Sequence, residues 1–236
     1  MAAPALPPTV RIVSGEIQSA TATHRFIVPS TGLSAWPPFE QIGETVVSRT
    51  RRFPPHAHER QEVLTYVSEG TAEYRVGDRP AETVAPGSAI LLSTTERVTH
   101  AISPLPGPSV RWFTLVTSLV ARIPETRLQT SHRPKTPSYE DTALVRDLLG
   151  FSVGMRSAGA VECREVTFVR RSTSFQGVGH DRRAVVYALD GSGTVEGHGL
   201  QAGEGALVAD TSGIAIGGTP GFRVITATAP LAVPER

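Results

Sequence analysis

The chain has 236 residues and a formal net charge of +1, with 39% hydrophobic and 19% charged residues. This length allows one large all-β domain or two small ones, and the composition is that of an ordinary globular protein. The near-zero net charge gives no electrostatic basis for direct binding of nucleic acid or of an anionic membrane.

The cysteine content and the lack of long apolar segments bear on the cell compartment. Cys163 is the single cysteine, so no internal disulfide is possible, which suits a reducing compartment. No apolar run approaches the roughly 20 residues of a membrane-spanning helix. The first residues lack the basic start and apolar core of a signal peptide. We therefore expect a cytoplasmic protein without membrane contact.

Short strand-like runs fill most of the chain after a loosely packed arm at residues 1–9. The abundance of glycine, proline, valine and threonine favours such short strands and frequent turns. Alternating or apolar runs occur at residues 9–13, 26–28, 44–50, 63–67, 71–76, 82–84, 89–92, 99–103, 110–116, 165–170, 184–189, 206–208 and 222–226. This spacing predicts an all-β sandwich or barrel.

The middle of the chain has a different pattern. Residues 121–140 carry prolines, threonines and serines and indicate a linker. Residues 139–150 are predicted to form the one good helix, with early acidic residues, apolar i,i+4 pairs and a terminal glycine. The predicted domains are an N-terminal barrel at 1–120, the linker and helix at 121–150, and a C-terminal barrel at 151–236.

The second half repeats the first in order and spacing. Residues 62–70 align with 183–191, and after a shorter hairpin residues 85–91 align with 202–208. We infer two copies of one small β-barrel joined by the linker.

Four polar residues could form a metal site in the first copy. His56 and His58 are separated by a single residue on an extended segment, so their side chains point to one face. Glu62, four residues beyond His58, is predicted to share that face, and the barrel could bring His100 back to them. Imidazole and carboxylate donors suit Fe(II), Mn, Ni, Cu or Zn. The alternative is that the first two histidines are surface loop residues and His100 is a satisfied buried histidine.

The repeat provides an internal comparison for these four positions. The framework of the two halves matches while all four polar residues are replaced, which predicts a single metal site in the N-terminal barrel. Glycine at three of the four matching positions also leaves room for a vacant or ligand-holding cavity in the C-terminal barrel. The alignment pairs His56 with Gly177, His58 with Gly179, Glu62 with Arg183 and His100 with Gly217.

A set of residues comprises the run at 56–62, then Gly70, Pro86-Gly87 and His100. This set resembles the two sequence motifs of the cupin superfamily. The two-barrel layout and the run at 53–70 resemble more narrowly the pirin-type bicupins, which hold a metal in the N-terminal barrel and have a degenerate C-terminal barrel. In pirins a glutamate two residues after the last histidine ligates the metal, whereas Ile102 stands at that position here. The fourth ligand is then expected to be Glu62 or water.

The resemblance implies a mononuclear-metal dioxygenase of the flavonol-cleaving kind, or a related oxidoreductase, with Fe(II) as the preferred metal. Glu62 would serve as ligand and as proton acceptor. Apolar walls could come from Leu64, Tyr66, Leu92 and Trp112. A non-enzymatic regulator that binds a protein partner and a metal-dependent isomerase or lyase are the alternatives. The expected partner is a small-molecule substrate, and a homodimer is a possible assembly.

Overall fold

The computed structural model describes residues 9–15, 17–18, 22–29, 36–48, 53–107, 109–119, 123–132, 137–140, 143–179 and 181–231. Within these ranges the regular elements are β-strands, apart from one short 3₁₀ helix, η1 (Phe151–Val153). No helix in the described part of the chain is long and apolar enough to span a membrane. The predicted all-β fold is confirmed. Of the arm predicted at residues 1–9, residues 1–8 lie outside the described residues, and Thr9 begins strand β1.

The first barrel packs a seven-stranded sheet against a four-stranded sheet. The large sheet has the order β12-β9-β6-β11-β4-β3-β2, and the small sheet has the order β5-β10-β7-β8. The strands are β2 (Ile17–Gln18), β3 (Thr23–Val28), β4 (Phe39–Val47), β5 (His56–His58), β6 (Gln61–Glu69), β7 (Ala72–Val76), β8 (Glu82–Val84), β9 (Ala89–Ser93), β10 (Val98–Pro104), β11 (Val110–Ser118) and β12 (Arg127–Ser131).

The second barrel has the same construction. Its large sheet has the order β1-β20-β17-β22-β15-β14-β13, and its small sheet has the order β16-β21-β18-β19. The strands are β1 (Thr9–Ser14), β13 (Ser138–Glu140), β14 (Ala143–Leu149), β15 (Glu162–Phe168), β16 (Ser172–Gly177), β17 (Arg182–Asp190), β18 (Ser192–Val195), β19 (His198–Gln201), β20 (Glu204–Ala209), β21 (Gly213–Gly218) and β22 (Arg223–Pro230).

The two strand orders show the internal repeat directly. The central strand β6 occupies the place that β17 occupies in the second sheet, and β9 occupies the place of β20. The predicted alignments of 62–70 with 183–191 and of 85–91 with 202–208 place these same strands over one another. The repeat inferred from the sequence is therefore confirmed at the level of topology.

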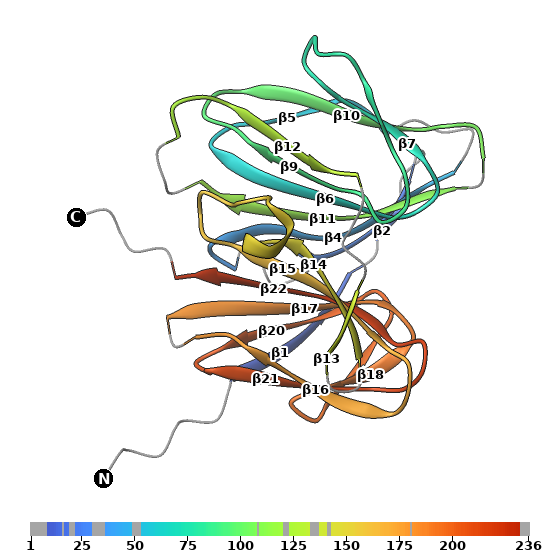
Figure 1. The fold of residues 1–236 in the computed structure, drawn as a ribbon, viewed down its shortest axis with the longest axis vertical. Coiled ribbons are helices and arrows are strands. Elements are labelled where there is room, and N and C mark those ends of the chain that lie inside the picture. Colours follow the sequence, from blue (N-terminus) through green and yellow to red (C-terminus); the bar gives the residue numbers. More distant parts are fainter. Residues whose placement is uncertain are drawn as a thin grey trace.

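Several strands lie outside the predicted boundaries of the barrel that they join. Strand β1 pairs with β20 and completes the second barrel, although it lies within the predicted domain 1–120. Strand β12 pairs with β9 of the first barrel, although it lies within the predicted linker. Strands β13 and β14, from the predicted linker and helix, also belong to the second barrel. The predicted division therefore differs from the observed sheet membership (Figure 1).

The predicted helix at 139–150 is wrong. Its described residues form strand β13, strand β14 and the bridge residue Gly150, and β14 pairs along its length with β15. A register shift between Asp147 and Leu149 interrupts the alternation, so that Leu148 and Leu149 are both buried. This bulge produces spacings between apolar residues that mimic an i,i+4 helical pattern, and long-range strand pairing outweighs the local helix preference.

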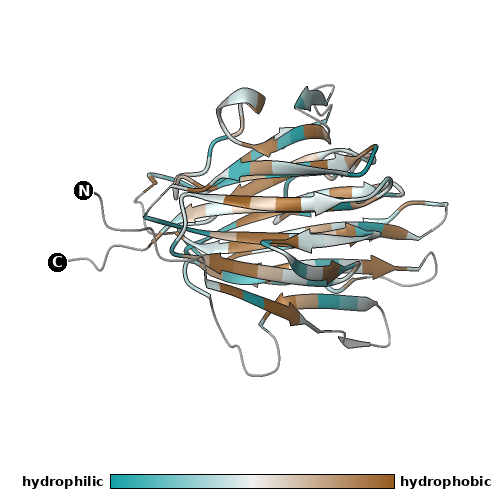
Figure 2. Ribbon diagram, turned by 90° about the horizontal axis from the view of Figure 1, so that it is seen from below, coloured by the Kyte–Doolittle hydropathy of each residue, from teal (hydrophilic) through white to brown (hydrophobic). Residues whose placement is uncertain are grey.

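The two large sheets face each other at the centre of the molecule, and the small sheets lie on the outside (Figure 1). Hydrophobic residues recur along the strands (Figure 2). They form one cluster inside each barrel and a third between the large sheets. The third cluster joins residues such as Leu64 and Phe113 of the first barrel to Tyr187 and Leu207 of the second. The two barrels are therefore held together by a continuous apolar layer.

Ion pairs extend the contact at the edge of this layer. The fully buried carboxylate of Glu44 accepts hydrogen bonds from Arg25 Nη1 at 3.0 Å and from Arg111 Nε at 2.6 Å. Arg111 Nη1 also donates to Asp190 Oδ1 of the second barrel at 2.7 Å. The guanidinium of Arg111 thus bridges carboxylates of the two barrels, which compensates the burial of Glu44.

Cys163 provides a test of the layer between the sheets. Its thiol is fully buried in the central cluster, and burial raises its pKa above the ordinary value, with a smaller contribution from the charge of Glu165. We expect the thiol to remain unreactive toward an aromatic disulfide reagent at pH 8 and to become reactive only as urea unfolds the protein. Absorbance of the released thiolate measures this. Fast, stoichiometric labelling without urea would contradict the burial.

Candidate metal centre

Three histidines meet in the first barrel, on the paired strands β5 and β10. His56 and His58 lie two residues apart on β5, so they share one face of the small sheet. His100 on β10 is the register partner of His56. One ring nitrogen from each of the three side chains lies within 4.8 Å of the other two. The structure thus brings together three of the four residues that the sequence grouped.

The hydrogen bonds of the rings orient the nitrogens toward one point. Nδ1 of His56 lies 3.3 Å from the carbonyl oxygen of Pro54, and Nδ1 of His58 lies 2.7 Å from Oε1 of Gln61. Both Nδ1 atoms therefore have an acceptor, which leaves each Nε2 with a free lone pair. Nε2 of His100 lies 2.9 Å from Nε2 of His56. This arrangement presents Nε2 atoms to one small volume.

The environment keeps these imidazoles neutral. His58 and His100 are buried, and His56 is half-buried. Burial lowers the pKa of all three, and for His100, where the other two histidines contribute further, it lowers the pKa to about 2. Neutral imidazole is the form that binds a metal.

The donor set fits a divalent metal ion. Nε2 of His58 is buried and has no hydrogen-bond partner among the described residues. An unpaired buried acceptor is costly unless something completes it. Two nitrogens that share one ion at right angles lie about 3 Å apart, given metal–nitrogen distances of about 2.1 Å. The 2.9 Å separation of the His56 and His100 Nε2 atoms agrees with that spacing.

A chain of polar side chains behind His58 fixes its ring. Gln61 accepts from His58 through Oε1, and its own amide nitrogen donates to Glu40. Glu40 in turn accepts from the hydroxyl of Ser118. Such partners of metal-bound histidines orient the ring and select the tautomer. No sequence pattern indicated this role, because Gln61 becomes a neighbour of His58 only through the turn between β5 and β6.

We expect Gln61→Leu to weaken metal binding by roughly 10- to 100-fold, since the ring of His58 loses the acceptor that orients it. Calorimetric titration of the protein with a divalent metal ion measures the change in affinity. Gln129→Leu is the matched control, because Gln129 bonds to Arg156 and lies outside the chain of contacts to His58. Equal affinities for the two variants would show that Gln61 does not position the histidine.

Glu62, predicted as metal ligand and catalytic base, does not join the histidines. The prediction assumed an unbroken strand from His58 to Glu62. Instead, Arg60 has a left-handed backbone with φ 52° at the turn between β5 and β6, which ends the alternation. On β6, Val63 belongs to the cluster inside the barrel, whereas Leu64 belongs to the layer between the large sheets. Glu62 shares the face of Leu64 and points away from the barrel interior.

The carboxylate of Glu62 is occupied by contacts to the segment before β15. It accepts from the amide nitrogens of Ala158 and Gly159, both at 3.0 Å, and from the hydroxyl of Ser157. The hydroxyl of Ser93 donates to it at 2.7 Å. Four donors therefore hold this buried carboxylate, which serves to fasten the segment 157–159 to the first barrel.

The predicted apolar walls divide between two places. Leu92 and Trp112 belong to the cluster inside the first barrel, but Leu64 and Tyr66 lie in the layer between the large sheets. Phe53, which the sequence did not single out as a wall residue, packs edge-on against His56 with ring centroids 5.0 Å apart. Its ring also meets Trp112 at 5.5 Å, so aromatic side chains flank the histidines.

Ile102 stands where pirins are expected to have a metal-binding glutamate. Its side chain is buried in the cluster inside the first barrel. No carboxylate joins the three histidines among the described residues. The ligand set offered by the described residues is therefore three neutral imidazoles.

Strand pairing corrects the predicted correspondence between the barrels. Gly70 and Gly191 follow the central strands with the same left-handed backbone, φ 73° in each. Counting from these glycines, Tyr74 on β7 corresponds to Val195 on β18. These two residues provide a common reference point on the small sheets.

The next strand of each small sheet can be compared from that point. Tyr74 pairs with Ile102, and its counterpart pairs with Ile216. In the first barrel, His100 lies two residues before Ile102 and pairs with His56 on β5. In the second barrel, Ile214 lies two residues before Ile216 and pairs with Gln176 on β16. The counterparts of His56, His58 and His100 are therefore Gln176, Val178 and Ile214, not Gly177, Gly179 and Gly217. Val178 and Ile214 are part of the second barrel's core, which rules out a metal site of this kind there.

One known family matches part of this sequence, and solved structures share its fold. The family described as AraC-like ligand binding domain matches residues 40–165. No curated protein matches the sequence. Many solved structures share the fold, and three of them, all of low sequence identity, follow.

One of these structures is GK1651 from Geobacillus kaustophilus, with TM-score 0.81, 20% identity, and coverage of 97% of this chain and 98% of that one. Another is the bacterial pirin YhhW in complex with nickel(II) from Escherichia coli, with TM-score 0.81, 15% identity and coverage of 95% and 100%. The third is quercetin 2,3-dioxygenase from Acinetobacter baumannii, with TM-score 0.76, 16% identity and coverage of 95% and 79%.

These likenesses agree with the all-β cupin fold of two similar barrels. The family match includes the β5, β6 and β10 strands that carry the histidines and Gln61, and it spans 126 of the 236 residues (165 − 40 + 1). The chain belongs to the family of AraC-like ligand binding domains.

Proposed function

We propose that the protein is a pirin-like bicupin whose N-terminal barrel holds one divalent metal ion and catalyses a dioxygenase or related oxidoreductase reaction. The observation that carries this proposal is the convergence of one nitrogen each from His56, His58 and His100 within 4.8 Å. The fold is shared with a nickel-bound pirin and with a quercetin 2,3-dioxygenase, which supports the choice of chemistry. The substrate class is a small organic molecule with an enol, hydroxyl or carboxylate oxygen.

The all-histidine donor set decides the character of the site. Three neutral imidazoles do not offset the charge of a divalent ion, so the site suits an anionic oxygen of the substrate. A bound ion would supply Lewis acidity and, if redox-active, activation of dioxygen. Imidazole donors accept several first-row metals. We propose Fe(II) for the dioxygenase reaction, with Mn, Ni, Cu and Zn as alternatives.

The chain itself contributes binding, orientation and exclusion of water. His58 is fixed by Gln61, and His100 is covered by the ring of Tyr74, whose centroid lies 5.3 Å from its own. Phe53 shields the side of His56. Glu62 does not supply a proton acceptor, because four donors hold its carboxylate elsewhere.

A second candidate is a metal-dependent isomerase or lyase. The absence of a carboxylate from the ligand set of the described residues favours this alternative, since more of the ion's charge remains available to polarise a substrate carbonyl. Such a reaction needs no oxygen. Oxygen consumption therefore separates the two candidates.

Metal content and oxygen uptake test the proposal together. We expect elemental analysis of the purified protein to find close to one transition-metal ion per chain, and we expect reconstitution with Fe(II) to give oxygen uptake with at least one member of a polyphenol panel. His56→Ala should remove both signals. Bound metal with no oxygen uptake would favour the isomerase, lyase or regulatory alternatives, and lack of any metal binding would overturn the proposal.

A further inference from the structure

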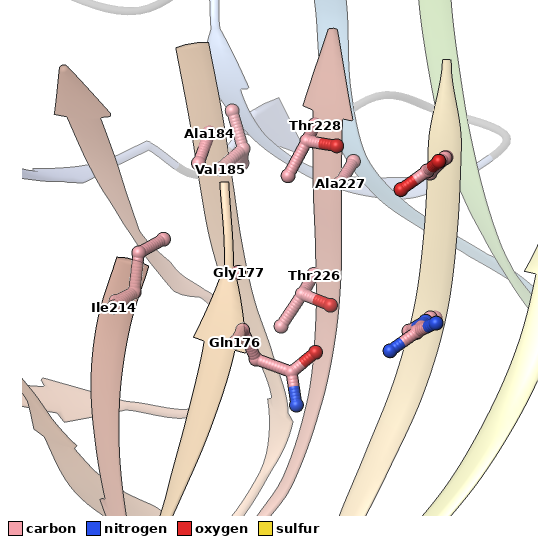
Figure 3. Close-up of a pocket in the computed structure, with 10 residues that line it drawn as sticks. Gln176, Gly177, Ala184, Val185, Ile214, Thr226, Ala227 and Thr228 are labelled. Atoms are coloured by element: carbon pink, nitrogen blue, oxygen red, sulfur yellow. The ribbon is translucent and has the colours of Figure 1, made fainter. Parts of the chain in front are cut away.

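The second barrel contains a cavity of about 210 Å³ that plays no part in the proposed metal centre. It is lined by residues of strands β15, β16, β17, β21 and β22, and Figure 3 shows most of their side chains. The volume lies below the roughly 300–1,000 Å³ of drug-sized ligand sites. The cavity therefore suits a small metabolite.

The cavity lies at the place that corresponds to the metal centre. Gln176 and Ile214, which line it, are the counterparts of His56 and His100. Ile214 has no ligand atom, and the amide oxygen of Gln176 suits hard cations and not the transition metals that imidazole binds. The second barrel thus keeps the position of a site while its residues suit a different ligand.

One wall of the cavity is polar and is built from two adjacent strands. Glu162 on β15 pairs with Thr228 on β22, and Arg164 pairs with Thr226. Residues two apart on a strand share one face, so a carboxylate, a guanidinium and two hydroxyl groups line the same wall. The close-up shows the two threonines on the same side of β22, with the amide of Gln176 near Thr226 (Figure 3).

The carboxylate of Glu162 and the guanidinium of Arg164 do not form an ion pair with each other. Within the described part of the chain, Glu162 takes part in no ion pair or side-chain hydrogen bond. Arg164 pairs with Asp147 through Nε at 2.9 Å, and its two terminal nitrogens have no partner among the described residues. The amide of Gln176 donates to Ser174 at 3.3 Å, while its oxygen has no described partner. The wall thus offers a carboxylate and a guanidinium edge to a ligand.

The other side of the cavity is apolar. It is formed by Ile214 and Ala184, both of which are buried and belong to the cluster inside the second barrel. A ligand that fits both sides carries a cationic group and an anionic group close together and a short aliphatic part. Salt-bridge geometry favours a carboxylate on the arginine fork, and the carboxylate of Glu162 is suited to an ammonium group.

We propose that this cavity binds a free α-amino acid with a short aliphatic side chain. Its ammonium group lies against Glu162, its carboxylate against Arg164, and its side chain against Ile214 and Ala184. Thr226 and Gln176 supply further hydrogen bonds to the carboxylate. This site is independent of the metal centre, because it shares no residue with it.

Calorimetric titration of the full chain with L-valine tests the proposal. Isobutylamine and isovalerate, which are valine without its carboxylate and without its ammonium group, are the matched probes. We expect L-valine to bind with one site per chain, and each single-charge probe to bind at least tenfold more weakly. Glu162→Gln and Arg164→Gln should each weaken valine binding by roughly tenfold or more. Glu73→Gln, which changes an exposed carboxylate of the first barrel, is the control and should leave binding unchanged.

Valine binding should not depend on the metal centre. His56→Ala should leave valine binding intact, which distinguishes failure of this proposal from failure of the metal centre. Circular dichroism of each variant checks that the fold is kept. Absence of valine binding overturns the proposal, as does equal binding of valine and isovalerate or binding that Glu162→Gln does not change.

Discussion

Replacing His100 with alanine is expected to abolish metal binding. The residue supplies one of only three convergent nitrogens among the described residues, and its Nε2 lies 2.9 Å from that of His56. Loss of one ligand leaves two imidazoles that cannot hold the ion by themselves. Changes in the groups that merely orient ligands cost about 10- to 100-fold in affinity, so loss of the ligand itself should exceed about 100-fold.

Equilibrium dialysis followed by elemental analysis measures this effect on purified protein. The bound metal should fall from about one ion per chain to nearly none, and stabilisation of the protein by added metal should disappear with it. His198→Ala is the matched control, because His198 is exposed on the second barrel. Replacing the buried His100 could also disturb the fold, so His56→Ala, at a half-buried position, serves as a second variant. Full metal binding by both variants would mean that the histidines do not form the site.

Replacing Glu62 with alanine should destabilise the protein while leaving its metal affinity unchanged. The substitution leaves the amides of Ala158 and Gly159 and the hydroxyl groups of Ser93 and Ser157 without their acceptor. Unsatisfied buried donors cost about 1–3 kcal/mol each, and water can reach some of them. We therefore expect a loss of about 2–4 kcal/mol in the free energy of unfolding.

Urea denaturation followed by tryptophan fluorescence measures the loss, and metal titration of the same variant gives the affinity. Glu73→Ala, an exposed change on β7, should shift stability by less than about 0.5 kcal/mol. A Glu62 variant that stays fully stable but loses metal would reverse this assignment. It would return the residue to the role that the sequence pattern predicted.

The all-β class and the internal repeat could be predicted from the sequence, because both depend on local patterns of residues. The two histidines of β5 could be placed on one face because the alternation of side chains along a strand is a local property. The repeat could be recognised because both halves keep the sequence of their central strands. The segment 139–150 lies beyond the reach of such local patterns. A bulge between Asp147 and Leu149 gave β14 an apolar spacing that also suits a helix. Pairing with β15 decides the outcome, and that pairing depends on residues far along the chain.

The candidate site shows the same division. His56, His58 and His100 were grouped correctly as neighbours, since a barrel returns β10 to β5. Glu62 was misplaced because a single left-handed residue, Arg60, turns the chain between two strands. That turn also brought Gln61 to His58, which no spacing rule predicts.

The sequence by itself determined the all-β class, the internal repeat and the three histidines, because these follow from local alternation and from motif spacing. Only the tertiary structure decided which barrel receives β1 and β12, which face of β6 carries Glu62, and which residues of the second barrel replace the histidines. Each of these depends on the register between distant strands or on the backbone of a single turn residue. A register shift of one residue turns every side chain of a strand to the opposite face, and one left-handed turn residue ends the alternation that a straight strand would keep.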